Sequence, residues 1–178
     1  MDPLSTGLGG ALLARALPSR ACPTGKRAAG RPGEEVASRL WTTTTLTVTA
    51  AAVLPDVDIV FDIFSSDALA SLTLHRAFTH SYLGAVVMAP LVALAVGRFR
   101  RDLGFARLTL LALLGFLWHI FTDLCTSWGT IVYWPFSRER VAWDILFIID
   151  FTFTAVLLLP HLLAWVYRER TGALRRGV

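Results

Sequence analysis

Long apolar segments constrain this chain more than any other feature. Three of them, at residues 80–97, 108–127 and 145–167, approach or exceed the roughly 20 residues that a helix needs to cross a bilayer. The chain has 178 residues, 54% hydrophobic and only 17% charged. A single soluble domain of this size cannot bury so much apolar surface, and a disordered or collagenous chain would be far more polar. The pattern predicts an all-α membrane protein.

Two further apolar segments are shorter. Residues 4–17 are glycine-rich and predict a short N-terminal helix, either a fifth span or a partly inserted one. Residues 40–54 are threonine-rich, end at Pro55 and predict another span. Between them, residues 18–39 hold prolines, glycines and basic side chains, which is typical of a flexible loop. We therefore expect one membrane-embedded domain over residues 1–178, a polytopic helical bundle of about four spans plus the N-terminal helix.

The basic residues are concentrated in alternate loops. Residues 15–39, 98–107 and 168–176 hold 14 of the 17 lysines and arginines. By the positive-inside rule these loops lie in the cytoplasm, together with the basic tail 168–178 and the C-terminus. In a soluble protein the net charge of +4 would suggest a nucleic-acid partner. In a membrane protein we expect membrane lipids as partners and no nucleic acid.

Aspartates and histidines gather at the outer ends of four segments. His119 and Asp123 are four residues apart and therefore lie on one face of a helix. A charged side chain within a membrane costs roughly 2.5–3.5 kcal/mol or more, so Asp123 and Asp150 need a partner, a proton or a metal ion. The other members of the set lie at the ends of the neighbouring segments: Asp56, Asp58, His75, His80 and Asp144.

Imidazoles and carboxylates together suit zinc, with manganese or iron as alternatives. The candidate ligands of one or two metal ions are Asp56, Asp58, His75, His80, His119 and Asp123. A divalent ion would offset several carboxylates and lower the pKa of its bound water toward about 7, which makes that water a nucleophile at neutral pH.

Several of these residues also have simpler interpretations. Asp56 could cap a turn after Pro55, and Asp144 is either a candidate catalytic residue or only a cap of the last span. Asp150 lies deeper in the expected span, where a cap is hard to explain, and is a candidate catalytic residue as a metal-supporting partner or proton carrier. Arg76 could stabilise negative charge in a reaction. Alternatively Arg76, with Arg138 and Arg140, could only contact lipid headgroups.

Four short motifs resemble those of the YdjM-like membrane-bound metal-dependent hydrolases. They are Leu54-Pro55-Asp56-Val57-Asp58, His75-Arg76-Ala77-Phe78-Thr79-His80-Ser81, His119-Ile120-Phe121-Thr122-Asp123 and Trp134-Pro135-Phe136-Ser137, preceded by the start Met1-Asp2-Pro3-Leu4. The resemblance covers nearly the whole chain except residues 18–39 and the tail. It implies a multi-pass protein of the bacterial inner membrane with a metal site on the His and Asp positions. The family usually has Thr-His where this chain has Ser5-Thr6.

The order of these motifs is more loosely similar to that of the all-helical zinc-dependent phospholipases C, which bears on the substrate class alone. Together the residues and the resemblance predict a metal-dependent hydrolase, in which metal-activated water attacks a phosphoester or phospholipid-like substrate at the outer face of the membrane. A metal-ion or proton permease is the alternative from another class. A catalytically inactive structural protein is the third, favoured by Thr6 in place of the family histidine.

Overall fold

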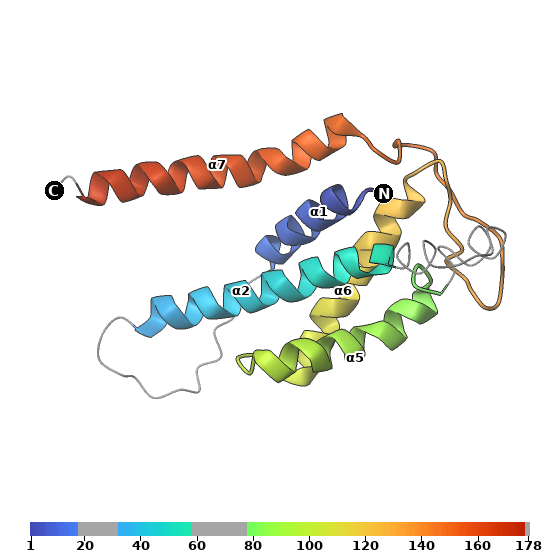
Figure 1. Ribbon diagram of the computed structural model, residues 1–178, viewed down its shortest axis with the longest axis horizontal. Helices are drawn as coiled ribbons and strands as arrows, with labels where there is room; N and C mark the ends of the chain where they lie inside the picture. Colours follow the sequence, from blue (N-terminus) through green and yellow to red (C-terminus); the bar gives the residue numbers. More distant parts are fainter. Residues whose placement is uncertain (18–31, 58–77, 177–178) are drawn as a thin grey trace.

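The chain folds into a set of helices packed side by side (Figure 1). The computed structural model describes residues 1–17, 32–57 and 78–176. Within these ranges regular structure is helical, apart from two isolated β-bridges, which confirms the predicted all-α class. The elements are α1 (Pro3–Ala16), α2 (Pro32–Val53), the 3₁₀ helix η1 (Leu54–Val57), α5 (Tyr82–Phe99), α6 (Phe105–Leu124) and α7 (Phe151–Arg176).

Successive helices run in opposite directions (Figure 1). The α5–α6 turn and the C-terminal ends of α1 and α7 lie at one end of the molecule. The N-terminus, η1, the start of α5 and the α6–α7 connection lie at the other. This arrangement places the polar segments around residues 56, 80 and 123 at one end.

Two helices, α5 and α6, are long and apolar enough to cross a membrane. A shorter apolar stretch, Phe151–Val166, lies in α7. Large apolar side chains face outward on both long helices, among them Leu94, which is 59% exposed, and Leu110, which is 66% exposed. Such surfaces are costly in water and are the normal lipid-facing surface of a membrane helix.

Helices α2 and α6 approach so closely that one position tolerates only glycine. A Cβ atom built on Gly115 would lie 2.4 Å from the carbonyl oxygen of Val48 and 2.8 Å from the Cβ of Ala51. Small residues at such contacts let membrane helices pack backbone against backbone. The contact fixes the relative position of the two helices that carry Asp56 and His119.

Two predicted boundaries are wrong. The predicted flexible loop, residues 18–39, gives way to helix at Pro32, because proline fits the first turn of a helix. The last helix begins at Phe151 rather than at residue 145. Here tertiary pairing overrides apolar character, since the amides of Ile145 and Leu146 both donate to the carbonyl of Cys125, at 2.9 and 2.8 Å.

Candidate metal centre

Helix α6 contributes a histidine and an aspartate from one face, as their spacing predicts. His119 and Asp123 are both fully buried near its C-terminal end. The ring nitrogen Nδ1 of His119 lies 2.7 Å from the carbonyl oxygen of Ala52 in α2. A carbonyl can only accept, so Nδ1 carries the hydrogen and Nε2 of the neutral ring keeps its lone pair. That lone pair is what a metal ion binds.

His80 lies just before α5 and is also fully buried. The next residue, Ser81, caps α5 by accepting a hydrogen bond from the amide of Gly84 at 2.9 Å, which fixes the turn that holds His80. The hydroxyl of Thr79 lies 2.9 Å from Nδ1 of His80. The rings of His80 and His119 meet edge to face with centroids 4.8 Å apart, so both Nε2 atoms point into one space.

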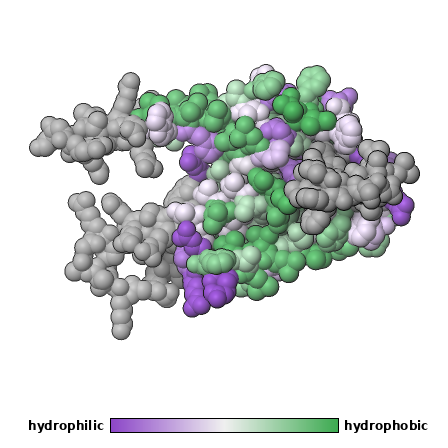
Figure 2. Space-filling view, in the orientation of Figure 1, coloured by the Kyte–Doolittle hydropathy of each residue, from purple (hydrophilic) through white to green (hydrophobic). Residues whose placement is uncertain are grey.

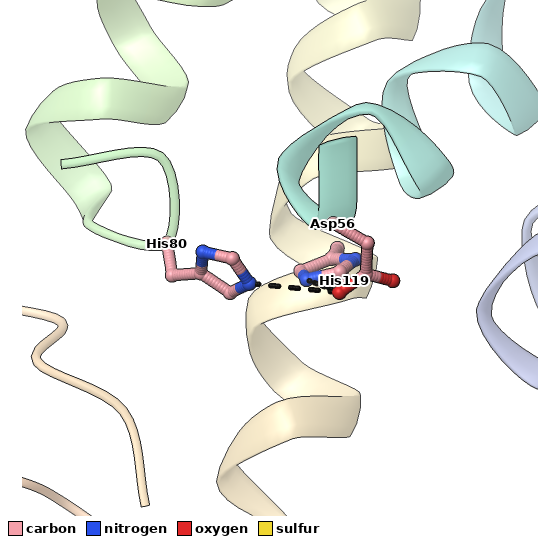
Figure 3. A group of neighbouring side chains, drawn as sticks. All are labelled: Asp56, His80 and His119. Atoms are coloured by element: carbon pink, nitrogen blue, oxygen red, sulfur yellow. Dashed lines mark ion pairs between the residues drawn. The ribbon is translucent and has the colours of Figure 1, made fainter. Parts of the chain in front are cut away.

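Asp56 enters the same space from η1, directly after α2 (Figure 3). Its Oδ1 atom lies 3.7 Å from Nε2 of His80 and 3.7 Å from Nε2 of His119. The ligand atoms of these three residues all lie within 4.8 Å of one another. The side chain of Asp56 is 15% exposed, whereas those of His80 and His119 are fully buried, so Asp56 is the most open of the three.

Asp123 completes a four-atom set. Its Oδ2 atom lies 3.5 Å from Nε2 of both His80 and His119, while its Oδ1 atom accepts a hydrogen bond from the N-terminal amine of Met1. Separations of 3.5–3.7 Å are too long for good hydrogen bonds. Atoms bound to one tetrahedral zinc at about 2.0–2.1 Å are about 3.3 Å apart, and the four histidine–carboxylate distances come close to that spacing.

The electrostatics of the cluster fit a cation. In neutral His119 the lone pair of Nε2 faces oxygens of Asp56 and Asp123, an arrangement that is repulsive unless a cation or a proton lies between them. In the part of the chain that the structure describes, neither Nε2 of His119 nor the buried Oδ2 of Asp56 makes a hydrogen bond. Unsatisfied buried polar atoms are rare in folded proteins. Two imidazoles and two carboxylates therefore fit a divalent metal ion.

The structure brings together four of the predicted ligands, namely Asp56, His80, His119 and Asp123. The other two predicted ligands, Asp58 and His75, lie outside the described residues, as does Arg76.

Asp144 and Asp150 lie in the irregular connection before α7. Asp144 is exposed and adopts a left-handed backbone conformation with a φ of 53°. Asp150 accepts a hydrogen bond from the amide of Phe153 at 2.9 Å and so caps α7. The expectation that Asp150 lies too deep for a cap is wrong, because the helix begins one residue after it. Its catalytic role, like that of Asp144, stays a prediction.

Some surrounding groups could not be identified from the sequence. The carbonyl of Ala52 orients His119, and no sequence pattern marks a backbone carbonyl. Helix α1 contacts α6 beside the centre, where the carbonyl of Thr6 accepts a hydrogen bond at 3.1 Å from the indole of Trp118, the residue before His119. The Thr6 side chain is fully buried and donates to the carbonyl of Asp2 at 3.1 Å. In the sequence, only the resemblance of the start Met1-Asp2-Pro3-Leu4 to the family associates α1 with the site.

Cys125 follows α6 directly. Burial raises the pKa of its thiol. In the described residues, the group of ligand atoms that converges consists of nitrogen and oxygen atoms and does not include this thiol.

Comparison with known proteins identifies the family of this chain. It is 28% identical to the uncharacterized protein YfhP of Bacillus subtilis (strain 168) over 115 residues, 65% of this chain. The match spans 33% of YfhP, about a third of that protein's length. No solved structure matches the chain. The family model described as YdjM inner membrane protein matches residues 1–177. The chain therefore belongs to the YdjM inner membrane protein family.

Proposed function

We propose that this protein is a metal-dependent hydrolase of the bacterial inner membrane, acting on a phosphoester or phospholipid-like substrate. One observation carries the proposal: two histidine nitrogens and two carboxylate oxygens converge at 3.5–3.7 Å in a buried space reached past Asp56. Mixed nitrogen and oxygen donors favour zinc, with manganese or iron as alternatives. Such an ion, when bound, supplies Lewis acidity and lowers the pKa of water toward about 7.

The protein's own residues prepare the site. The Ala52 carbonyl holds the His119 ring in one tautomer, and the hydroxyl of Thr79 contacts the far nitrogen of His80. Such outer contacts orient ligands and raise their affinity for metal. Asp56, at the more open side, is the ligand placed nearest to an incoming substrate. Arg76 remains a candidate to stabilise the negative charge of the reacting group.

The interior beyond the centre favours hydrolysis over transport. Toward the α5–α6 turn the core is apolar, formed by Ala14, Val48, Ala93, Leu103, Leu108 and Leu111. Two buried hydroxyls of α2 are already engaged, because Thr43 donates to Asp102 and Thr47 donates to the carbonyl of Thr43, whereas the buried Oγ1 of Thr49 makes no hydrogen bond within the described residues. An ion pathway needs polar groups or water along its length. The described residues therefore favour a site at one end over a permease.

The positions of the arginines and of the metal centre also support one orientation of the protein in the membrane. The α5–α6 turn and the helix ends beside it hold four arginines within residues 98–107, and they lie at the end opposite the metal centre (Figure 1). With that turn and the C-terminus in the cytoplasm, the centre faces the outer leaflet. In this proposal the protein crosses the membrane about four times, with α2 and α7 as spans beside α5 and α6.

Metal content and turnover of the purified protein test the proposal. We expect the wild type to retain about one or two equivalents of divalent metal and to release product from a short-chain phospholipid or a soluble phosphodiester. His119→Ala removes a ligand nitrogen and should abolish both. His161→Ala is the matched control, because His161 contacts the carbonyl of Leu8 in α1, at 3.2 Å, rather than the cluster.

The outcomes separate the alternatives. A wild type without metal would overturn the metal centre itself. Metal retention without hydrolysis, combined with metal uptake into proteoliposomes, would favour the permease. Metal retention with neither activity would favour the inactive structural protein. Cleavage of the soluble phosphodiester but not of the phospholipid would keep the hydrolase and exclude the lipid substrate.

A further inference from the structure

A pocket lies at the α5–α6 turn, at the end of the molecule opposite the metal centre. It has a volume of about 420 Å³ and is lined by residues of both helices and of the turn. Ala93, the lining residue of α5 that is nearest to His80 in the sequence, follows it by 13 residues, which is roughly 20 Å at 1.5 Å per residue. The pocket is therefore distinct from the candidate metal centre, and nothing in the proposed hydrolysis accounts for it.

The pocket is positively charged. Arg98 and Arg101 both line it, and both are exposed. In the described ranges, no carboxylate lies within ion-pair distance of either arginine, whereas the nearby Asp102 accepts a hydrogen bond from Thr43. Figure 2 shows hydrophilic surface at this end of the molecule beside the hydrophobic surface of α5. Two such guanidinium groups match the charge and geometry of a phosphate group.

The remaining residues that line the pocket are apolar. Some of them are buried, and others are exposed on the outer surface of the helices. Leu103 and Leu108 form a buried floor, at 8% and 1% exposure. Leu94 and Phe105, at 59% and 52% exposure, line the pocket on the outward surface of the helices. A free anion would contact the arginines and leave the apolar side chains exposed to water. A phospholipid would cover both the arginines and the apolar side chains. Basic pockets between membrane helices are typical sites for anionic headgroups.

We infer that this pocket binds an anionic phospholipid, with its phosphate on Arg98 and Arg101 and an acyl chain along Leu94 and Phe105. The site anchors the α5–α6 hairpin at one membrane surface. It does not depend on the proposed hydrolysis, because it uses none of the metal ligands.

Native mass spectrometry of the full chain in neutral detergent tests this inference. The probe is phosphatidylglycerol offered together with phosphatidylcholine of the same acyl chains. We expect the wild type to retain phosphatidylglycerol preferentially. Each basic residue near an anionic headgroup contributes roughly fivefold in affinity, so R98Q/R101Q should weaken phosphatidylglycerol binding roughly thirtyfold. The control R15Q/R100Q removes the same charge outside the pocket and should keep the preference.

Three results would overturn the inference. The first is a wild type with no preference for the anionic lipid. The second is an equal loss in R98Q/R101Q and R15Q/R100Q, which would indicate a general charge effect. The third is displacement of phosphatidylglycerol by equimolar inorganic phosphate, which would make this a free-anion site. Unchanged phosphatidylcholine binding in the variants shows that they are folded.

Discussion

At the scale of single residues, the metal centre depends on which nitrogen of each histidine is available. The hydrogen bond from Nδ1 of His119 to the Ala52 carbonyl leaves Nε2 facing Asp56 and Asp123. In the proposed metal centre, a bound ion would add to the stability of the fold, because the ion binds the folded arrangement and not the dispersed ligands.

Chelation should therefore destabilise the wild type. At a metal concentration of 100 times Kd, binding adds about 2.7 kcal/mol, or roughly 5–10 °C in Tm for a chain of this size. Differential scanning fluorimetry with and without a chelator measures the shift. Asp123→Asn should lose most of it, because one ligand charge is gone. Glu139→Gln, which changes an exposed acid outside the cluster, should keep it. An unchanged Tm on chelation of wild type would contradict the prediction.

At the scale of helices, the close contact of α2 and α6 positions the centre. Asp56 follows α2 by a short 3₁₀ turn, and His119 lies one helical turn after Gly115. Any separation of these helices moves the carboxylate away from the imidazole. The strict requirement for a small residue at Gly115 thus connects helix packing to the metal geometry.

Gly115→Ala should destabilise the protein, since its methyl group would overlap the Val48 carbonyl. Overpacking of this kind costs about 1–3 kcal/mol. The substitution should also displace the residues that hold the metal ligands in place, and this should weaken metal binding by roughly 10-fold or more. The same substitution at Gly97 is the control, because there the nearest atom is the end of the Leu108 side chain at 3.4 Å. Thermal unfolding and metal titration compare the two, and equal effects would exclude the close contact as the cause.

At the scale of the whole molecule, the alternating direction of the helices places a group of arginines at one end and the candidate metal ligands at the other. Four arginines lie at the α5–α6 turn, while Asp56, His80 and Asp123 lie at the other end. In the topology proposed from the positive-inside rule, the metal centre faces outward and the pocket lies at the cytoplasmic surface. The two sites would face opposite leaflets.

Cysteine labelling in spheroplasts tests this orientation. In a chain with Cys22→Ser and Cys125→Ala, a membrane-impermeant maleimide should label Glu139→Cys in the α6–α7 connection. It should label Gly104→Cys in the α5–α6 turn only after permeabilisation, because the bilayer separates that turn from the reagent. Both positions are exposed, so accessibility in the fold is matched. Labelling in the reverse order would invert the proposed topology.

The sequence by itself determined the helical class, the family and the pairing of His119 with Asp123, because apolar length, short motifs and i, i+4 spacing are local properties. It misplaced the start of the last helix and misread Asp150, since the pairing of residues 145 and 146 with Cys125 is not local. Only the tertiary structure decided that Asp56, His80, His119 and Asp123 share one space. Their convergence depends on helix contacts such as that of Gly115 with Val48, between segments far apart along the chain.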